Sequence, residues 1–74
     1  MEADGIDVFN VLGADYYIDW RRMSRGASFF IPTTATPRQV LASLTTARLA
    51  LDVDLVARPR CEYGLYGVRV WRTR

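Results

Sequence analysis

The residues with the clearest chemistry in this sequence are its arginines. All ten basic residues are arginine, and the chain has neither lysine nor histidine. A guanidinium group is planar, permanently charged and rich in N–H donors, so it binds carboxylates and phosphates and stacks on aromatic rings. Several arginines gather in the last third of the chain, in "ARPR" and in "GVRVWRTR" beside Trp71. This pattern predicts anion binding.

The same composition argues against catalysis. Without histidine the chain lacks the usual general base near neutral pH, and its serines have no histidine or lysine to activate them. Asp52 and Asp54 are expected to be solvated in a loop rather than to hold a cation. No Cys/His metal spacing and no phosphate-loop motif occurs. The sequence therefore predicts a protein that is not an enzyme and uses neither cofactor nor metal.

Length and composition predict one small folded domain. Of the 74 residues half are apolar and 12% are aromatic, which is typical of a packed chain. No apolar run reaches the roughly 18–20 residues that cross a bilayer, and the N-terminal segment is acidic where a signal peptide is basic. A lone Cys61 cannot form an internal disulfide and is expected to be buried. We therefore expect a cytosolic protein with no membrane partner.

The elements that would position the arginines begin with a hairpin and a helix. Residues 15–22 and 27–31 are rich in aromatic and branched side chains and predict two strands, paired antiparallel around a turn at Gly26. Thr36, Pro37 and Gln39 form a helix start signal, an N-cap followed by a proline and a capping-box glutamine. A helix is expected over 37–51, with its apolar stripe formed by Val40, Leu41, Leu44, Ala47 and Leu51.

Two further strands are expected at 55–62 and 67–73, joined by a glycine-bounded hairpin loop. Pro59 lacks an N–H donor, which predicts an edge strand or a bulge. The expected fold is α+β with the order ββαββ, a four-stranded antiparallel sheet with one helix packed on one face. Residues 1–14 are expected to form an acidic arm or short helix, and residues 15–74 the domain.

Alternation along the last strand predicts which arginines share a face. If Val68 and Val70 turn toward the helix, then Arg69 and Trp71 point the other way. Such a face is either the solvated side of a half-exposed sheet or a docking platform, since Trp and Arg are enriched at interface hot spots. The residues predicted to contact a partner are Arg58, Arg60, Arg69, Trp71 and Arg72.

The distribution of charge favours a protein partner. Residues 1–19 carry five acidic residues and no basic one, for a charge of −5, whereas residues 20–74 carry +7. An acidic segment opposes binding to phosphates but orients a protein encounter. The alternatives are a small DNA- or RNA-binding regulator that uses the same face, and a homodimer through the outer sheet face or an edge strand.

Two motifs resemble those of a class of very small tailed-phage proteins. That class carries Met-x-x-Gly-x-Ser-Phe-Phe-x-Pro, then a helix, then Gly-Val-Arg-Val-Trp-Arg. The resemblance covers about residues 20–74 and implies a phage or prophage origin, without assigning an activity. The acidic first 19 residues lie outside the pattern and indicate a specialised role. The function expected of the whole chain is to bind and inhibit or redirect a host protein or protein complex, including a nucleoprotein, as an anti-CRISPR or other anti-defence inhibitor does. The matching positions are Met23, Gly26, Ser28, Phe29, Phe30, Pro32, Gly67, Val68, Arg69, Val70, Trp71 and Arg72.

Overall fold

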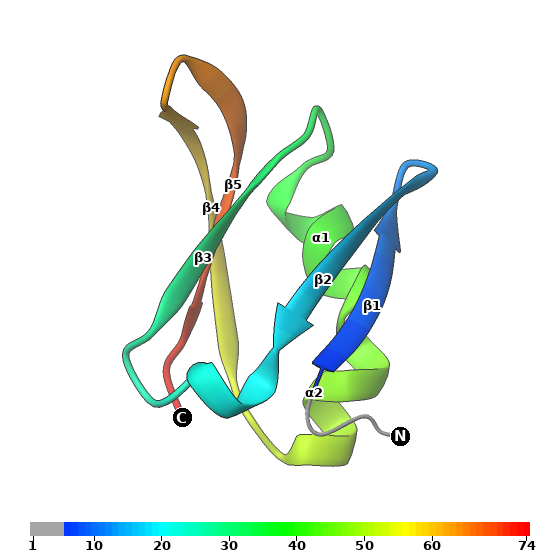
Figure 1. Cartoon of the computed structure of the whole chain (residues 1–74), viewed down its shortest axis with the longest axis vertical. Coiled ribbons are helices and arrows are strands. Elements are labelled where there is room, and N and C mark those ends of the chain that lie inside the picture. The colour runs from blue at the N-terminus through cyan, green and yellow to red at the C-terminus, as the bar shows by residue number, and fades with distance from the viewer. Residues whose placement is uncertain (1–5) are drawn as a thin grey trace.

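The fold is a small α+β arrangement of two antiparallel sheets and two helices. A computed structural model describes residues 6–74. One sheet pairs β1 (Ile6–Val11) with β2 (Ala14–Asp19), and the other has the order β3-β5-β4, from β3 (Ser28–Pro32), β5 (Leu65–Arg72) and β4 (Leu55–Glu62) (Figure 1). The helical segment is α1 (Pro37–Ser43) followed by α2 (Thr45–Leu51). The prediction of an α+β fold is confirmed, but that of a single four-stranded sheet was wrong.

The segment expected to be an acidic arm or short helix contains a strand. β1 and β2 form a hairpin across the two-residue turn Leu12–Gly13, in which both residues have positive φ, 52° and 85°. This conformation matches the twist of the flanking strands. Phe9 and Val11 are buried in the common core, so this part of the segment belongs to the domain. Residues 1–5 of the predicted arm lie outside the described residues.

The predicted pairing of the strands at 15–22 and 27–31 was also wrong. β2 ends at Asp19, whose carboxylate accepts a hydrogen bond from the backbone N–H of Arg21 (3.0 Å) and caps a 3₁₀ turn, η1 (Trp20–Arg22). The turn changes the direction of the chain before β3 begins. As a result β2 pairs with β1, and β3 pairs with β5 along its whole length, from Ser28 opposite Trp71 to Pro32 opposite Gly67.

The last two strands form the hairpin that was predicted. β4 pairs with β5 from Leu55 opposite Arg72 to Glu62 opposite Leu65, across the turn Tyr63–Gly64. β4 is an edge strand, as Pro59 indicated, and β5 occupies the centre of the sheet. β5 begins two residues earlier than expected and the hairpin projects past the rest of the sheet (Figure 1).

The helix begins as predicted and is interrupted in the middle. The hydroxyl of Thr36 accepts from the N–H of Gln39 (3.1 Å), and the Gln39 side chain accepts from the N–H of Thr36 (2.8 Å), which completes the capping box. The hydroxyls of Ser43 and Thr45 donate to the carbonyls of Val40 and Leu41. Such bonds compete with the helical ladder and bend helices. One predicted helix over 37–51 is therefore two short helices that meet at Leu44.

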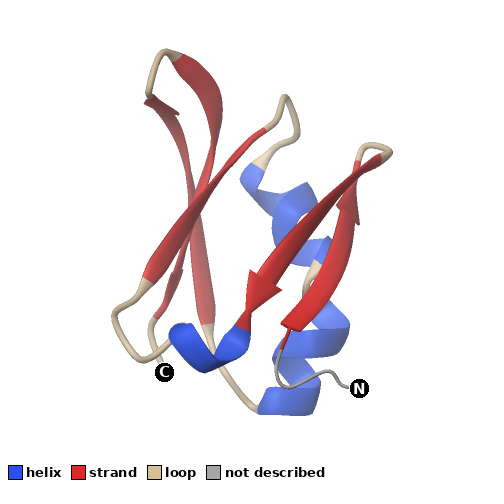
Figure 2. Ribbon diagram, in the orientation of Figure 1, coloured by secondary structure: helices blue, strands red, loops and turns tan. Residues whose placement is uncertain are grey.

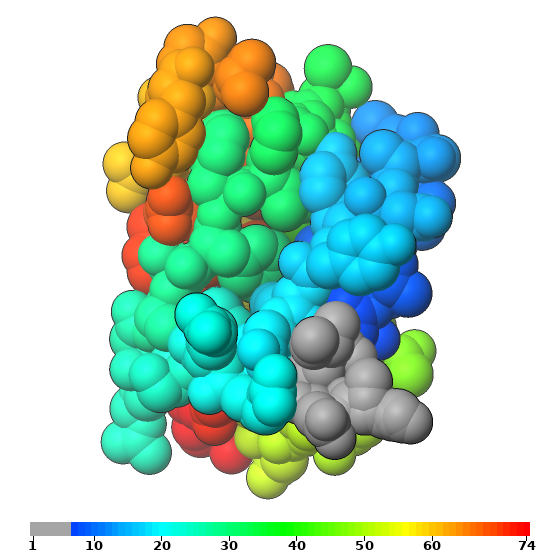
Figure 3. Space-filling view, viewed as in Figure 1, coloured from blue at the N-terminus to red at the C-terminus, as the bar shows by residue number. Residues whose placement is uncertain are grey.

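The core lies between the two sheets and the helical segment (Figure 2). α1 packs against both β4 and β1. The rings of Phe9, on the β1–β2 hairpin, and Phe29, on β3, meet edge to face at 6.1 Å. In the space-filling view the β1–β2 hairpin lies directly against β3 and the turn that follows β3 (Figure 3). The core residues are Phe9, Val11, Ile18, Met23, Ile31, Ala35, Val40, Leu44, Val53, Leu55, Ala57, Val68 and Val70.

Some apolar residues fall outside this core. Cys61 was expected to be buried and is exposed, because it lies opposite Tyr66 near the turn of the β4–β5 hairpin, away from the core residues. Leu51, the last residue of the predicted apolar stripe, is also exposed. Val40 and Leu44 of that stripe are fully buried, as predicted. The core is therefore concentrated under the middle of the helical segment.

The close contact of Gly67 with the neighbouring strand β3 predicts the effect of one substitution. A Cβ at Gly67 would fall against the carbonyl oxygen of Ile31 and 2.7 Å from Cζ of Phe30. We expect Gly67→Ala to lower the free energy of unfolding by about 1–3 kcal/mol, the usual effect of overpacking, and thermal melting to show it. Gly64→Asn is the control, because its site has open space and Asn tolerates positive φ. Equal melting temperatures of Gly67→Ala and the wild type would contradict the close approach.

Candidate functional site

The outer face of the three-stranded sheet carries the predicted arginines. Val68 and Val70 are completely buried, so Arg69 and Trp71 on β5 point to the opposite side. Arg58 and Arg60 on β4 share this outer side, because they stand opposite Arg69 and Gly67 in the ladder. The inner side faces the β1–β2 hairpin through Phe29, so the outer face points away from the hairpin.

Arg69 is held by neighbours on both flanking strands. Its Nε and Nη2 donate to the two carboxylate oxygens of Glu62 on β4, both at 2.6 Å, and its Nη1 donates to the hydroxyl of Ser28 on β3 at 2.7 Å. Its side chain is only 21% exposed. These bonds raise the pKa of Arg69 and lower that of Glu62. Arg69 was predicted to contact a partner, but here its donors are used to join the three strands.

The guanidinium of Arg69 also covers an aromatic ring. It lies 5.9 Å from the ring centroid of Phe30, which is within the range of a cation–π contact. Phe30 in turn meets the ring of Tyr63 edge to face at 6.5 Å. Phe30 is therefore covered on the outer face, whereas Trp71 borders an open depression.

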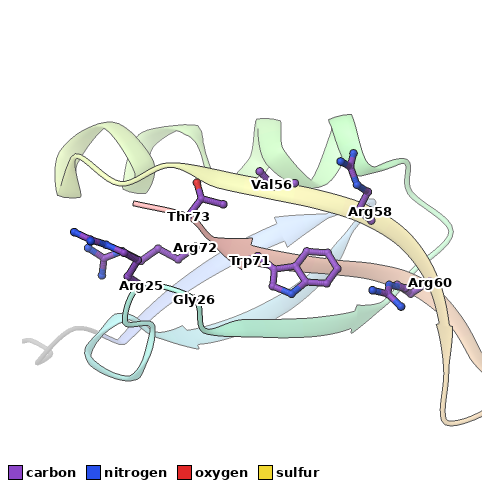
Figure 4. Close-up of a pocket in the computed structure, with 8 residues that line it drawn as sticks. All are labelled: Arg25, Gly26, Val56, Arg58, Arg60, Trp71, Arg72 and Thr73. Atoms are coloured by element: carbon purple, nitrogen blue, oxygen red, sulfur yellow. The ribbon is translucent and has the colours of Figure 1, made fainter.

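The depression beside Trp71 is the Arg/Trp pocket, with a volume of about 550 Å³ (Figure 4). It brings together four of the five residues predicted to contact a partner and leaves out Arg69. It also contains Arg25, which the sequence reasoning did not single out. The lining residues are Arg25, Gly26, Val56, Arg58, Arg60, Trp71, Arg72 and Thr73.

Most of the cations around this pocket have no ion-pair partner in the part of the chain that the structure describes. The guanidinium of Arg60 lies 5.2 Å from the centroid of the Trp71 ring. Within residues 6–74, no carboxylate lies within 4.0 Å of a guanidinium nitrogen of Arg25, Arg58 or Arg60. Arg72 is more restrained, since it donates to the backbone carbonyls of Met23 (2.7 Å) and Arg74 (3.0 Å). The pocket therefore combines unneutralised positive charge with an indole surface.

Arg25 enters the pocket because its turn is attached to the end of β5. The N–H of Gly26 donates to the carbonyl of Arg72 (2.8 Å), and the N–H of Arg72 donates to the carbonyl of Ala27 (3.0 Å). Gly26 has a φ of 87°, in agreement with the turn predicted there. The position of Arg25 directly before this turn glycine could have identified it as a pocket residue. It was missed because the turn was predicted to join two paired strands.

Glu62 lies on the same outer face as the pocket and is held by Arg69, whose hydrogen bonds lower its pKa, and the charge of Arg60 lowers that pKa further. The acidic side chains on β2 and before β4 lie elsewhere. Asp15 and Asp19 lie on β2, and Asp19 pairs with Arg21 at 3.0 Å. Asp52 and Asp54, expected to be only solvated, pair with Arg74 at 3.3 and 2.8 Å, and Arg74 lowers the pKa of Asp54. None of these acidic residues lines the pocket, so its arginines are open to an external anion.

The residues of the two motifs contact one another. The hydroxyl of Ser28 accepts a hydrogen bond from Arg69, the Phe30 ring lies against Gly67, and the carbonyl of Met23 accepts from Arg72. The motifs meet because they lie mainly on β3 and β5, which pair directly. Many residues of the two motifs therefore contribute to the fold. Arg25, Arg58 and Arg60 in the pocket are not among the matching positions.

Comparison of the chain with the models of known protein families, with curated proteins and with solved structures finds no match. Across residues 6–74, the helices are too short to traverse a bilayer. The same residues form no group of three or more side chains suited to hold a metal ion.

The contact between Arg69 and Glu62 predicts a pH dependence of stability. Because the pKa of Glu62 is lowered in the folded chain from its ordinary value of 4.5, its carboxylate stabilises the fold above that value. This contribution is lost as the pH falls through the lowered value. We expect the difference in unfolding free energy between the wild type and Glu62→Gln to shrink below about pH 4.5 in urea titrations. A constant difference from neutral to acid pH would show that the ion pair does not form.

Proposed function

We propose that this chain is a non-enzymatic interaction module that docks through the Arg/Trp pocket on an acidic surface of another protein. The observation that carries the proposal is a pocket in which Arg25, Arg58 and Arg60, which have no carboxylate partner within residues 6–74, lie around one partly exposed indole. Arg and Trp are the residue types that most often dominate binding energy at protein interfaces. Unpaired charges on a pocket rim also accelerate encounter with an oppositely charged partner.

The resemblance of the motifs to small tailed-phage proteins supports a host protein as the partner. Binding would then inhibit or redirect it in the host cytosol, as expected of an anti-CRISPR or other anti-defence inhibitor. Steric or electrostatic occlusion needs only a rigid charged surface. The three-strand contact of Arg69 supplies that rigidity next to the pocket.

A nucleic-acid regulator is less well supported by the same face. Proteins that bind single strands stack successive bases on several aromatic side chains. Trp71 is the one aromatic residue among those that line the pocket, and the neighbouring ring of Phe30 is covered by Arg69. A single aromatic ring can stack on one inserted side chain, but it cannot stack on the successive bases of a nucleic-acid strand.

Affinity capture from host lysate tests the proposal. We expect the wild type to retain a protein partner and Trp71→Ala to weaken its capture by about thirtyfold, equivalent to roughly 2 kcal/mol at a hot spot. Arg58→Ala tests the same pocket with an exposed side chain whose removal leaves the fold intact. Arg38→Ala is the matched control, because it removes an equal charge from an exposed site on α1 outside the pocket. Equal capture by all variants would contradict the proposal.

A salt titration separates the nucleic-acid alternative. We expect no binding of generic single-stranded or duplex oligonucleotides at about 50 mM salt, measured by fluorescence anisotropy. Binding that depends on Arg58 and falls at least tenfold between about 50 and 200 mM salt would instead assign the pocket to phosphate contacts.

A further inference from the structure

The Arg/Trp pocket has two positively charged ends separated by the indole of Trp71. Arg25 and Arg72 lie on one side of the ring, and Arg58 and Arg60 lie on the other (Figure 4). The strand register gives the same arrangement, because Trp71 stands opposite Val56, while Arg58 and Arg60 follow farther along β4. From Arg72 to Gly67, the residue opposite Arg60, β5 advances five residues, or about 17 Å.

The two ends are built from different elements and are held differently. Arg25 lies on the turn that is hydrogen-bonded to the end of β5, and the neighbouring Arg72 is anchored on Met23. Arg58 and Arg60 project from the edge strand β4, and both are exposed. Because the surface between the ends is formed by Val56, Gly26 and the indole, it is suited to an apolar group.

Resting on the proposed function, we infer that the pocket binds an acidic segment of the partner that has carboxylates on both sides of one apolar or aromatic side chain. The flanking carboxylates pair with the arginines at the two ends. The central side chain packs on Trp71, displacing the Arg60 guanidinium that now lies over the ring. Charge complementarity selects a polypeptide with separated carboxylates, because one compact anion cannot contact both ends.

Short blocked peptides test this inference directly. The probe is acetyl-Glu-Glu-Gly-Phe-Gly-Glu-Glu-amide, and its binding is followed by NMR through the indole N–H of Trp71, assigned with Trp71→Phe. We expect Arg25→Glu and Arg58→Glu each to weaken binding by about tenfold, because each converts an attraction into a repulsion. Arg38→Glu, with the same change of charge outside the pocket, should have no effect. Backbone amide spectra verify the fold of each variant.

Two half-reversed peptides distinguish the ends. One replaces the N-terminal Glu pair with Lys-Lys, and the other replaces the C-terminal pair. We expect Arg25→Glu to prefer one of these peptides and Arg58→Glu to prefer the other, because the reversed charges lie at opposite ends of the indole. The same preference in both variants, or none, would overturn the inference.

The outcomes also separate this inference from the proposed function. Capture of a host protein that depends on Trp71, together with no preference between the two half-reversed peptides, would overturn only the two-ended recognition. Failure of both capture and peptide binding would overturn both. Tighter binding of a thymidine oligonucleotide than of the acidic peptide, with inorganic phosphate competing for the Trp71 signal, would reassign the pocket to phosphates and overturn the inference.

Discussion

The structure depends on the three-strand contact of Arg69. One guanidinium on the central strand β5 binds Glu62 on β4 and Ser28 on β3, and it also covers the ring of Phe30. Because the helical segment separates β3 from the β4–β5 hairpin, the bond from Arg69 to Ser28 joins parts of the chain that no local turn connects. A bidentate Arg–carboxylate pair that is four-fifths buried has a fixed geometry, unlike a solvated surface pair. The positions of Trp71 and of the arginines on β4 follow from this fixed frame.

The same contact explains why arginines on one face differ in how they are held. Arg69 has used its donors within the molecule, whereas Arg58, next to Pro59 on the edge strand β4, is exposed and unpaired within the described residues. Their side chains are chemically identical, so the neighbours decide whether the guanidinium is used within the fold or stays available to an external anion. Arg72 is intermediate, since it holds the turn that presents Arg25 and still lines the pocket.

Local signals in the sequence predicted the local structure well. The capping box at Thr36, the edge position of Pro59 and the alternation of Val68 and Val70 with Arg69 and Trp71 all agree with the structure. Strand pairing could not be predicted in this way, because the β3–β5 contact spans the helices and has no local signature. β1 was missed because its turn, Leu12–Gly13, lacks the Asn or Asp typical of such turns. Arg25 was missed as a consequence of the wrong pairing.

The exposed Cys61 has a practical consequence for any work on this protein in solution. It is the single thiol of the chain. Because side chains alternate along a strand, Cys61 lies on the opposite side of β4 from its neighbour Arg60, which lines the Arg/Trp pocket. A dye attached to this sulfur would report on the molecule from one defined place without occupying the basic depression. In air, two molecules can become covalently linked there. A dimer observed without reductant would then reflect oxidation rather than assembly of folded surfaces.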